Sequence, residues 1–331
     1  MLPISELVRV ASALDSRWSS PLALEAARHW GYDCVRFVRS SATHVFWCGV
    51  GGAADFHGDA VVRLVPHAVP SSTSCADVAL LSRALASAGG PVAPAIATDD
   101  GCWTVDVHDG GESYTAACYD AAPGARLEES QLSASQANAW GRALAALHEA
   151  GTRAPSAIST RLPDWHRDHV AGAIAALAGT ELAACATEVG TWLDGLPRGR
   201  DVHGLVHGDP ELDNTIWDGG SPTFVDFDEA AHSWFAADIG FALRDFASPA
   251  QGPDPSDPLV ASFLAGYRTA RPLPDAQIGW LPMFARAHAL VTVAGLVPLL
   301  AEKPGADWPD WAQSLHQRLR ALVDELSAQL R

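Results

Sequence analysis

The apolar positions of the first 119 residues form the short runs typical of β-strands, with helical periodicity in two places. Strands are predicted over 33–38, 43–50, 59–65, 95–98, 102–107 and 113–119. A helix is predicted over 74–88, because Val78, Leu81 and Leu85 fall on one face and two glycines follow. A shorter helix over 20–30 begins at a capping serine and stops at a glycine. This pattern predicts a small lobe of mixed helix and strand.

From residue 120 onward the apolar positions recur at intervals of three and four, the period of an amphipathic helix. Ser133-Ala-Ser-Gln136 is a capping box and predicts the start of a helix that runs to Gly151. Further helices are predicted over 165–178, 181–196, 236–246, 258–268, 276–297 and 309–331. Pro282 is expected to kink or break the helix in which it lies. A strand–loop–strand segment over 203–227 interrupts the helices.

These elements predict an α+β chain of two parts. The first, residues 1–119 with leading helices within about 1–31, combines an antiparallel sheet with one main helix. The second, residues 120–331, is larger and mostly helical. Residues 249–258 are a loop by composition, to be interpreted as a lid or as a simple connector.

The composition is that of a globular protein, with 48% hydrophobic and 18% charged residues. A formal net charge of −17 argues against a nucleic-acid-binding protein, which needs a basic stripe for phosphates. The same charge permits a cationic small-molecule substrate, although acidic surfaces also serve solubility.

The cysteines and the apolar runs predict a cytoplasmic protein without a membrane span. None of the six cysteines forms a Cys-x-x-Cys pair, which favours reduced thiols over a disulfide framework. The N-terminal stretch carries Glu6 and Asp15 and lacks an apolar signal core. The most apolar stretch, 289–301, contains Pro298 and is too short to cross a bilayer. We expect a monomer or a homodimer.

Candidate chemistry concentrates in the strand–loop–strand segment. His207-Gly208-Asp209 is followed five positions after the aspartate by Asn214, and Asp226 ends the next short apolar run. Protein kinases have an aspartate and an asparagine at this spacing, and then a metal-binding aspartate. The pattern predicts that Asp209 orients the acceptor hydroxyl and that Asn214 and Asp226 hold Mg²⁺ through oxygen atoms. His207 is expected to support the loop and not to contact substrate.

The segments Leu205–Trp217 and Phe224–Ala230 resemble the aminoglycoside phosphotransferase (APH) and choline-kinase-like superfamily. That superfamily includes antibiotic kinases, type II homoserine kinase and related bacterial Ser/Thr kinases. The resemblance continues in Gly89–Ile96, in Gly141–His148 and in Ala237–Leu243. It implies a bilobal protein-kinase-like fold, with ATP or GTP bound between the lobes. It also implies that Asp238 braces the catalytic loop.

The family lysine that clamps the nucleotide phosphates is replaced by Arg63, and its helix partner corresponds to Asp77. Arginine keeps the charge and can bind phosphate in a bidentate manner. A longer arginine and a shorter acid can compensate for each other. The alternative is a surface arginine on a strand.

Two further parts of a nucleotide site are expected in the first lobe. The turn Ser40-Ser41-Ala42-Thr43 is placed to cover phosphates with N–H groups and hydroxyls, through Ser40, Ser41 and Thr43. The alternative cradle, Gly49-Val-Gly-Gly52, is better explained as a hairpin turn. The hinge that bonds the base through its main chain is expected near Ala116 and Cys118.

The acceptor site is expected in the second lobe. The candidate residues are Asp213, Asp228, Glu229, Trp165 and Trp234. A cluster of acids suits an acceptor that carries both an amine and a hydroxyl. The alternative is that each acid belongs only to a solvated acidic rim. Asp213 stands where the family often has glycine, so it either favours a cationic acceptor or tolerates a left-handed backbone.

The leading functional prediction is a Mg²⁺-dependent kinase that uses ATP or GTP to phosphorylate a hydroxyl of a small molecule. An antibiotic or an amino-sugar-like compound is the leading acceptor class. The alternatives within enzymes are a homoserine-kinase-like metabolic enzyme and a bacterial Ser/Thr protein kinase. An alternative of another class is a nucleotide-binding pseudokinase, because the lysine is missing.

Overall fold

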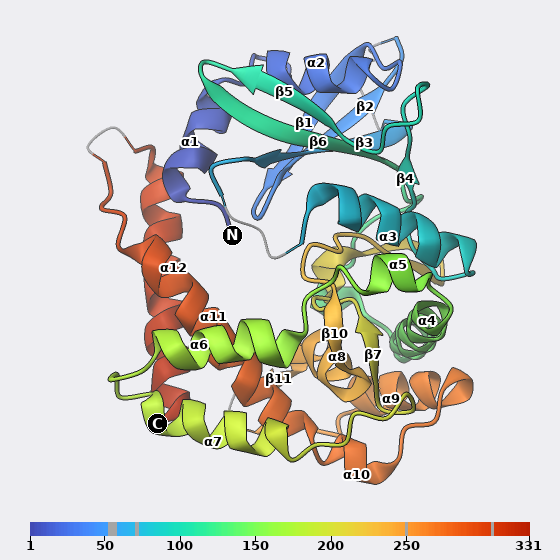
Figure 1. Cartoon of the computed structure of the whole chain (residues 1–331), viewed down its shortest axis with the longest axis vertical. Coiled ribbons are helices and arrows are strands. Elements are labelled where there is room, and N and C mark those ends of the chain that lie inside the picture. The colour runs from blue at the N-terminus through green and yellow to red at the C-terminus, as the bar shows by residue number, and fades with distance from the viewer. Residues whose placement is uncertain (52–57, 70–72, 249–250, 306–307) are drawn as a thin grey trace. The chain divides into compact units, whose positions relative to one another are not determined.

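The computed structural model describes residues 1–51, 58–69, 73–248, 251–305 and 308–331 (Figure 1). The chain divides into two compact units. The first comprises Met1–Ala84, Ala93–Ala121 and Glu302–Gln317, and the second comprises Leu85–Val92, Ala122–Ala301 and Arg318–Arg331.

The first unit contains an antiparallel sheet of six strands. Its strands are β1 (Cys34–Ser40), β2 (His44–Gly49), β3 (Ala60–Pro66), β4 (Ala95–Ile96), β5 (Val105–Asp109) and β6 (Glu112–Asp120). Their order is β1-β2-β3-β6-β4, and β5 also pairs with β6. Each predicted strand of this lobe therefore exists, with shifts of a few residues at its ends. Gly52, part of the glycine-rich alternative to the Ser40–Thr43 turn, lies outside the described residues.

Helices α1 (Ile4–Ser12), α2 (Pro21–Arg28) and α3 (Cys75–Ser87) accompany the sheet. Ser20 caps α2, since its hydroxyl accepts the N–H of Ala23 at 3.4 Å. Helix α2 lies against the sheet (Figure 1). Its buried face, which includes Leu22 and Ala26, packs with Phe46 and Val62 to form the core of this unit. The first unit is thus a small α/β layer structure, as the pattern predicts.

The second unit is built on the packing of α4 (Ala134–Thr152) against α9 (Pro258–Ala270). The predicted capping box at the start of α4 is confirmed, with Ser133 Oγ accepting the N–H of Gln136. A Cβ at Gly141 would lie 2.0 Å from the carbonyl oxygen of Phe263, so only glycine permits this close crossing. Trp140 meets the Phe263 ring edge-on, with centroids 5.0 Å apart.

The other helices match the predicted segments, except the short helix over 156–159, which was not predicted. They are α5 (Ser156–Ser159), η2 (Trp165–Val170, with π-helical turns), α6 (Ala171–Ala176), α7 (Ala183–Asp194), α8 (Phe235–Ala242), α10 (Asp275–Ile278), α11 (Leu281–Leu300) and α12 (Asp310–Leu330). Short 3₁₀ turns occur at η1 (Glu129–Gln131), η3 (Leu212–Asn214) and η4 (Arg244–Phe246). The predicted break at Pro282 is confirmed. Pro282 lies in the first turn of α11, where its missing N–H costs nothing.

The short strands of the second unit include several that the pattern does not predict. β7 (His203–Val206), β8 (Thr215–Asp218) and β9 (Ser221–Phe224) belong to the predicted strand–loop–strand segment. β10 (Ala231–Trp234), β11 (Ala247–Ser248) and β12 (Gly252–Pro253) are additional. β10 pairs antiparallel with β7, the strand that begins the strand–loop–strand segment. Within the 249–258 loop, β12 pairs with β11, the strand that directly precedes the loop, and a turn then leads into α9. Residues 249 and 250 lie outside the described residues.

One segment of the described chain, Asp275–Leu300, is long and apolar enough to cross a membrane by length and composition alone. The expectation that this region is too short therefore needs correction, because the helix extends further toward the N-terminus than the apolar stretch 289–301. Such a helix is weak evidence for a span. In this unit α11 packs against α6, α7 and α8.

Candidate active site

The catalytic loop follows β7 and ends in the short helix η3, after which β8 and β9 form a hairpin. Thr215 pairs with Phe224 in that hairpin, and the N–H of Val225 donates to the carbonyl of Asn214 at 2.9 Å. The hairpin therefore brings Asn214 and Asp226 to the same end of the loop. This is the local geometry that the spacing of the two residues predicts.

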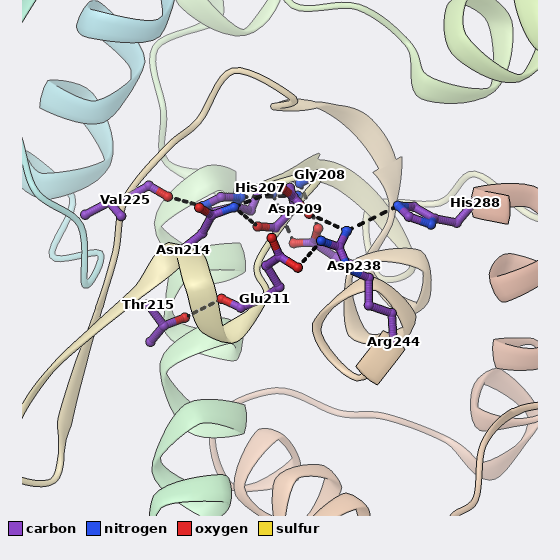
Figure 2. Close-up of polar contacts among 10 residues, drawn as sticks. All are labelled: His207, Gly208, Asp209, Glu211, Asn214, Thr215, Val225, Asp238, Arg244 and His288. Carbon is purple, nitrogen blue, oxygen red and sulfur yellow. Dashed lines mark hydrogen bonds and ion pairs between the residues drawn. The ribbon is translucent and has the colours of Figure 1, made fainter. Parts of the chain in front are cut away.

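Asp238, in the first turn of α8, holds the start of the loop (Figure 2). Its Oδ2 accepts the N–H of His207 at 3.0 Å, and its Oδ1 accepts the N–H of Gly208 at 2.8 Å. The carboxylate is fully buried, so these charge-assisted bonds replace its hydration. Gly208 has a φ of +86°, and a Cβ there would lie 1.9 Å from the carbonyl of Glu229. The loop geometry thus requires glycine at this position.

A buried chain of hydrogen bonds continues behind Asp238. His148 Nε2 lies 2.9 Å from Asp238 Oδ2, and His148 Nδ1 lies 2.8 Å from the hydroxyl of Tyr267. Burial lowers the pKa of His148, against the attraction of Asp238. The neutral imidazole then donates from Nε2 to Asp238 and accepts from Tyr267, which fixes the carboxylate from the rear. The sequence motif ending at His148 marks this residue, but only the fold brings it to Asp238.

His207 supports the loop as predicted. Its Nδ1 accepts the N–H of Asp209 at 3.2 Å, so the ring proton is on Nε2, which donates to the carbonyl of Val225 at 3.1 Å. The ring packs on Phe227, with centroids 4.3 Å apart. His207 thereby ties the catalytic loop to the residue that precedes Asp226.

The carboxylate of Asp209 is held from two sides (Figure 2). Its Oδ2 accepts from the amide Nδ2 of Asn214 at 2.9 Å, and its Oδ1 accepts from Nη1 of Arg244 at 2.7 Å. Arg244 also forms an ion pair with Glu211. His288 Nε2 lies 3.5 Å from the same Nη1, and burial together with the Arg244 charge lowers the pKa of His288 to about 3. Sequence reasoning missed Arg244, Glu211 and His288, because none lies in the motif spacing.

Asn214 and Asp226 are suited to a hard divalent cation. Asn214 uses its Nδ2 toward Asp209, so its amide oxygen is the atom that it would offer to a metal. Asp226 has a φ of +71°, a left-handed conformation that is uncommon for aspartate and marks a constrained position. An amide oxygen and a carboxylate fit the ligand preference of Mg²⁺. Asp213, for which a left-handed backbone was one explanation, has an ordinary φ in η3; that explanation is wrong, and the strained residue is Asp226.

The predicted phosphate-binding residues lie together in the first unit. Ser40 and His44 close the β1–β2 hairpin, with Ser40 Oγ 2.7 Å from His44 Nδ1, and Ser41 lies in the turn. The guanidinium of buried Arg63 donates to Thr43 Oγ1, at 3.0 Å from Nη2. Arg63 is thus no surface arginine, because the sheet buries it beside the predicted turn.

Other predicted nucleotide residues occupy defined elements of the first unit. Asp77 lies in the first turn of α3, where its carboxylate accepts from Ser74 Oγ at 2.7 Å. Ala116 and Cys118 lie within β6, paired with β3 on one side and with β5 or β4 on the other. Their participation in base binding stays a prediction.

The acceptor candidates divide into buried and accessible residues. Trp165 is 4% exposed and packs on Phe241, while Trp234 is fully buried and donates from Nε1 to the carbonyl of Pro197 at 2.7 Å. The expectation that these two tryptophans contact an acceptor is wrong, because both belong to the core of the second unit.

The acidic candidates remain at the surface. Asp213 and Glu229 are exposed, and Asp228 is half-buried. Burial and the carboxylates of Asp209 and Asp226 raise the pKa of Glu229. The Oε2 atom of Glu229 lies 3.8 Å from His169 Nδ1. Glu229, Asp209 and Asp226 therefore form one negatively charged neighbourhood at the catalytic loop.

A loop carboxylate that is braced by a buried aspartate, hydrogen-bonded to an amide and followed by a second carboxylate is the arrangement that phosphoryl transfer to a hydroxyl uses. A model of the phosphotransferase enzyme family APH matches residues 33–273. The chain belongs to this family, and its fold is that of the APH kinases.

Named relatives of the chain are kinases of small molecules. Amicoumacin kinase of Bacillus subtilis is 25% identical over 281 residues, which cover 81% of this chain and 82% of the relative. A homoserine kinase of Methylobacterium radiotolerans is 30% identical over 179 residues. This match covers 50% of this chain and 53% of the relative.

The structure resembles solved kinases over nearly its whole length. Amicoumacin kinase hAmiN, in complex with AMP-PNP, Ca²⁺ and Ami, matches with a TM-score of 0.68 at 19% identity. The match covers 97% of this chain and 93% of that one. The predicted kinase-like fold is thereby confirmed.

Proposed function

We propose that this phosphotransferase is a Mg²⁺-dependent kinase that transfers the γ-phosphoryl group of ATP or GTP to a hydroxyl of a small molecule. The observation that carries the proposal is the placement of Asp209. Its carboxylate is fixed by Asn214 on a loop that Asp238 braces. A positioned carboxylate of this kind is what transfer to a hydroxyl requires from a protein.

In the proposed reaction the acceptor hydroxyl donates a hydrogen bond to Asp209 while its oxygen attacks the γ-phosphorus. The bond from that phosphorus to the bridging oxygen breaks, the nucleoside diphosphate leaves, and the hydroxyl proton passes to the Asp209 carboxylate. Phosphoryl transfer needs little covalent chemistry beyond this, so the rate depends on orientation and on charge. The hydrogen bond from Asn214 keeps the carboxylate aligned for this step.

Asn214 and Asp226 would hold the metal, whose charge offsets that of the phosphates when it is bound. We assign the nucleotide phosphates to Arg63, Asp77 and the Ser40–Thr43 turn, and the base to the main chain near Ala116 and Cys118. The first unit is accordingly proposed as the nucleotide-binding lobe and the second as the catalytic and acceptor-binding lobe. The complex of hAmiN with AMP-PNP and Ca²⁺ supports the use of a nucleotide and a divalent cation.

For the acceptor we propose an antibiotic or an amino-sugar-like compound. The amicoumacin kinases support this class, as does the acidic neighbourhood of Asp209. A homoserine-like metabolite is the second candidate, supported by the homoserine kinases that match half of the chain. A bacterial Ser/Thr protein kinase and a nucleotide-binding pseudokinase are the remaining alternatives.

The test is an acceptor screen with ATP and GTP over aminoglycosides, other antibiotics, amino alcohols, homoserine, sugars and a protein substrate. The proposal expects Mg²⁺-dependent γ-phosphoryl transfer to at least one small molecule, lost in Asp209→Asn. Asp218→Asn, an exposed aspartate at the end of β8, serves as the matched control and should keep full activity. Labelling of the protein substrate alone would refute the small-molecule assignment. Nucleotide binding without any transfer would favour the pseudokinase.

A further inference from the structure

Arg244 contacts the carboxylate of Asp209, the group that the proposed reaction brings to the acceptor hydroxyl. In the described structure both oxygens of the Asp209 carboxylate carry a hydrogen bond, one from Asn214 and one from Arg244. The bond from Asn214 belongs to the catalytic loop itself. The bond from Arg244 comes from η4, outside the loop, so it is the one that an incoming hydroxyl would have to share or replace.

The other side of Arg244 faces a cavity of about 440 Å³ that lies entirely within the second unit. Segments from α8 to β11, α11 and α12 line it, with Phe241, Leu322 and Leu326 as apolar wall residues. Gln329, also in the wall, has a buried Oε1 without a hydrogen-bond partner. An unsatisfied acceptor of this kind suits a ligand that brings a donor. Arg244 therefore separates this cavity from the catalytic carboxylate.

The charges around Arg244 favour a cation at its position. Asp209 and Glu211 contact its guanidinium, and Asp245 and Glu325 stand in the cavity wall. The adjacent His288 is neutral near pH 7, because its pKa lies at about 3. Two acids thus pair with the arginine and two more line the cavity beside it, a charge pattern that disfavours an anionic group and attracts an ammonium group.

We propose that Arg244 is a specificity-determining residue that stands in for the cationic group of the acceptor. In the acceptor-free protein its guanidinium neutralises Asp209 and Glu211. An acceptor that carries an ammonium group near its hydroxyl displaces the guanidinium, takes over the pairing with the two acids and presents the hydroxyl to Asp209. A neutral alcohol cannot replace the lost ion pairs and is rejected. This inference rests on the proposed kinase function for its biological meaning, although not for its test.

The test measures cation binding and needs no turnover. Arg244→Ala and the wild type are titrated with methylguanidinium and with ethanolammonium, at constant ionic strength, by thermal shift and by calorimetry. Both cations should bind Arg244→Ala about tenfold or more tightly than the wild type. The uncharged probe ethylene glycol should bind neither protein. Arg286→Ala is the matched control, because Arg286 is a half-buried arginine of α11 that pairs with Glu188 and does not contact Asp209.

The outcomes separate the alternatives. Equal cation affinity in Arg244→Ala and in the wild type would overturn the proposal, as would equal gains in Arg286→Ala. If Arg244→Ala does not fold, Arg244→Gln removes the charge with less loss of packing and undergoes the same titrations. If the acceptor screen finds an amine-bearing substrate, its KM should fall about fivefold or more in Arg244→Gln. A rise in that KM would show instead that Arg244 binds the acceptor. The cations can bind Arg244→Ala more tightly, as expected, while the acceptor screen finds no kinase activity. That result would refute the proposed function but not the role of Arg244.

Discussion

Replacing Asp238 by asparagine tests whether this residue holds the catalytic loop. The two side chains have nearly the same shape, so the change removes charge and acceptor capacity with little loss of packing. The carboxylate accepts three hydrogen bonds, from the N–H groups of His207 and Gly208 and from His148. An asparagine offers one acceptor oxygen and brings an NH₂ group that can only donate.

The magnitude follows from these bonds. His148 can change its tautomer and accept from the new NH₂ group, because Tyr267 can accept in return. The main-chain N–H groups of His207 and Gly208 can only donate. In either orientation of the asparagine amide, one of these two N–H groups therefore faces the NH₂ group, which is also a donor. A buried unsatisfied N–H costs about 1–3 kcal/mol, and the loss of charge assistance at the remaining bonds adds to that. We expect local destabilisation of about 2–4 kcal/mol in the loop.

Hydrogen exchange followed by mass spectrometry measures this locally. Peptides covering residues 205–212 should lose protection by roughly 30-fold or more in Asp238→Asn, since about 1.4 kcal/mol corresponds to a factor of ten. Misplacement of Asp209 by about 1 Å should lower kcat by about 100-fold. Asp218→Asn, an exposed aspartate of β8, should change neither quantity. Unchanged exchange over 205–212 together with full activity in Asp238→Asn would refute the reasoning.

Three further predictions concern the same unit. Gly208→Ala should destabilise the protein by more than about 2 kcal/mol, because strain at φ +86° adds to a contact of 1.9 Å with a main-chain carbonyl. Gly219→Ala is the control, because Gly219 has a φ of +57° and open space around it, so the change should cost only the backbone strain. Equal unfolding midpoints for the two variants would contradict the argument. Asn214→Ala should raise the Mg²⁺ concentration for half-maximal activity about tenfold or more, and an unchanged Mg²⁺ titration would remove this residue from the metal site. Acid should weaken the fold, because His288 and His203 have folded pKa values of about 3 and about 4, below the ordinary 6.5. Their stabilisation is therefore complete above about pH 6.5 and is lost as the pH falls below it, by about 1–2 kcal/mol for His288 between pH 7 and pH 5. Urea midpoints against pH test this, and a slope that His288→Gln does not reduce would contradict it.

The elements and the motif positions could be predicted because their signals are local. Ser133-Ala-Ser-Gln136 caps α4 and Pro282 starts α11 through hydrogen bonds within one helical turn. The fixed offset from Asp209 to Asn214 spans one loop, so its geometry hardly depends on the rest of the chain. Short-range chemistry of this kind is readable from the sequence.

The errors arise where burial or long-range pairing decides. Trp165 and Trp234 look like aromatic contacts for a ligand, but helix packing places both in the core. β10 is too short to be predicted alone and exists because β7 pairs with it. The left-handed backbone occurs at Asp226, after the β8–β9 hairpin, and not at Asp213.

The class of chemistry could be predicted from the sequence alone, because Asp209, Asn214 and Asp226 lie at the spacing that kinases use for phosphoryl transfer. Most of the helices and strands could be predicted as well, because their periodicity is a property of neighbouring residues. Only the tertiary structure decided how Asp209 is held, because Arg244 lies 35 positions away and its bond depends on how η4 packs. The same is true of His148 and Asp238, 90 positions apart. Contacts between distant segments follow from the packing of whole elements, which no local spacing encodes.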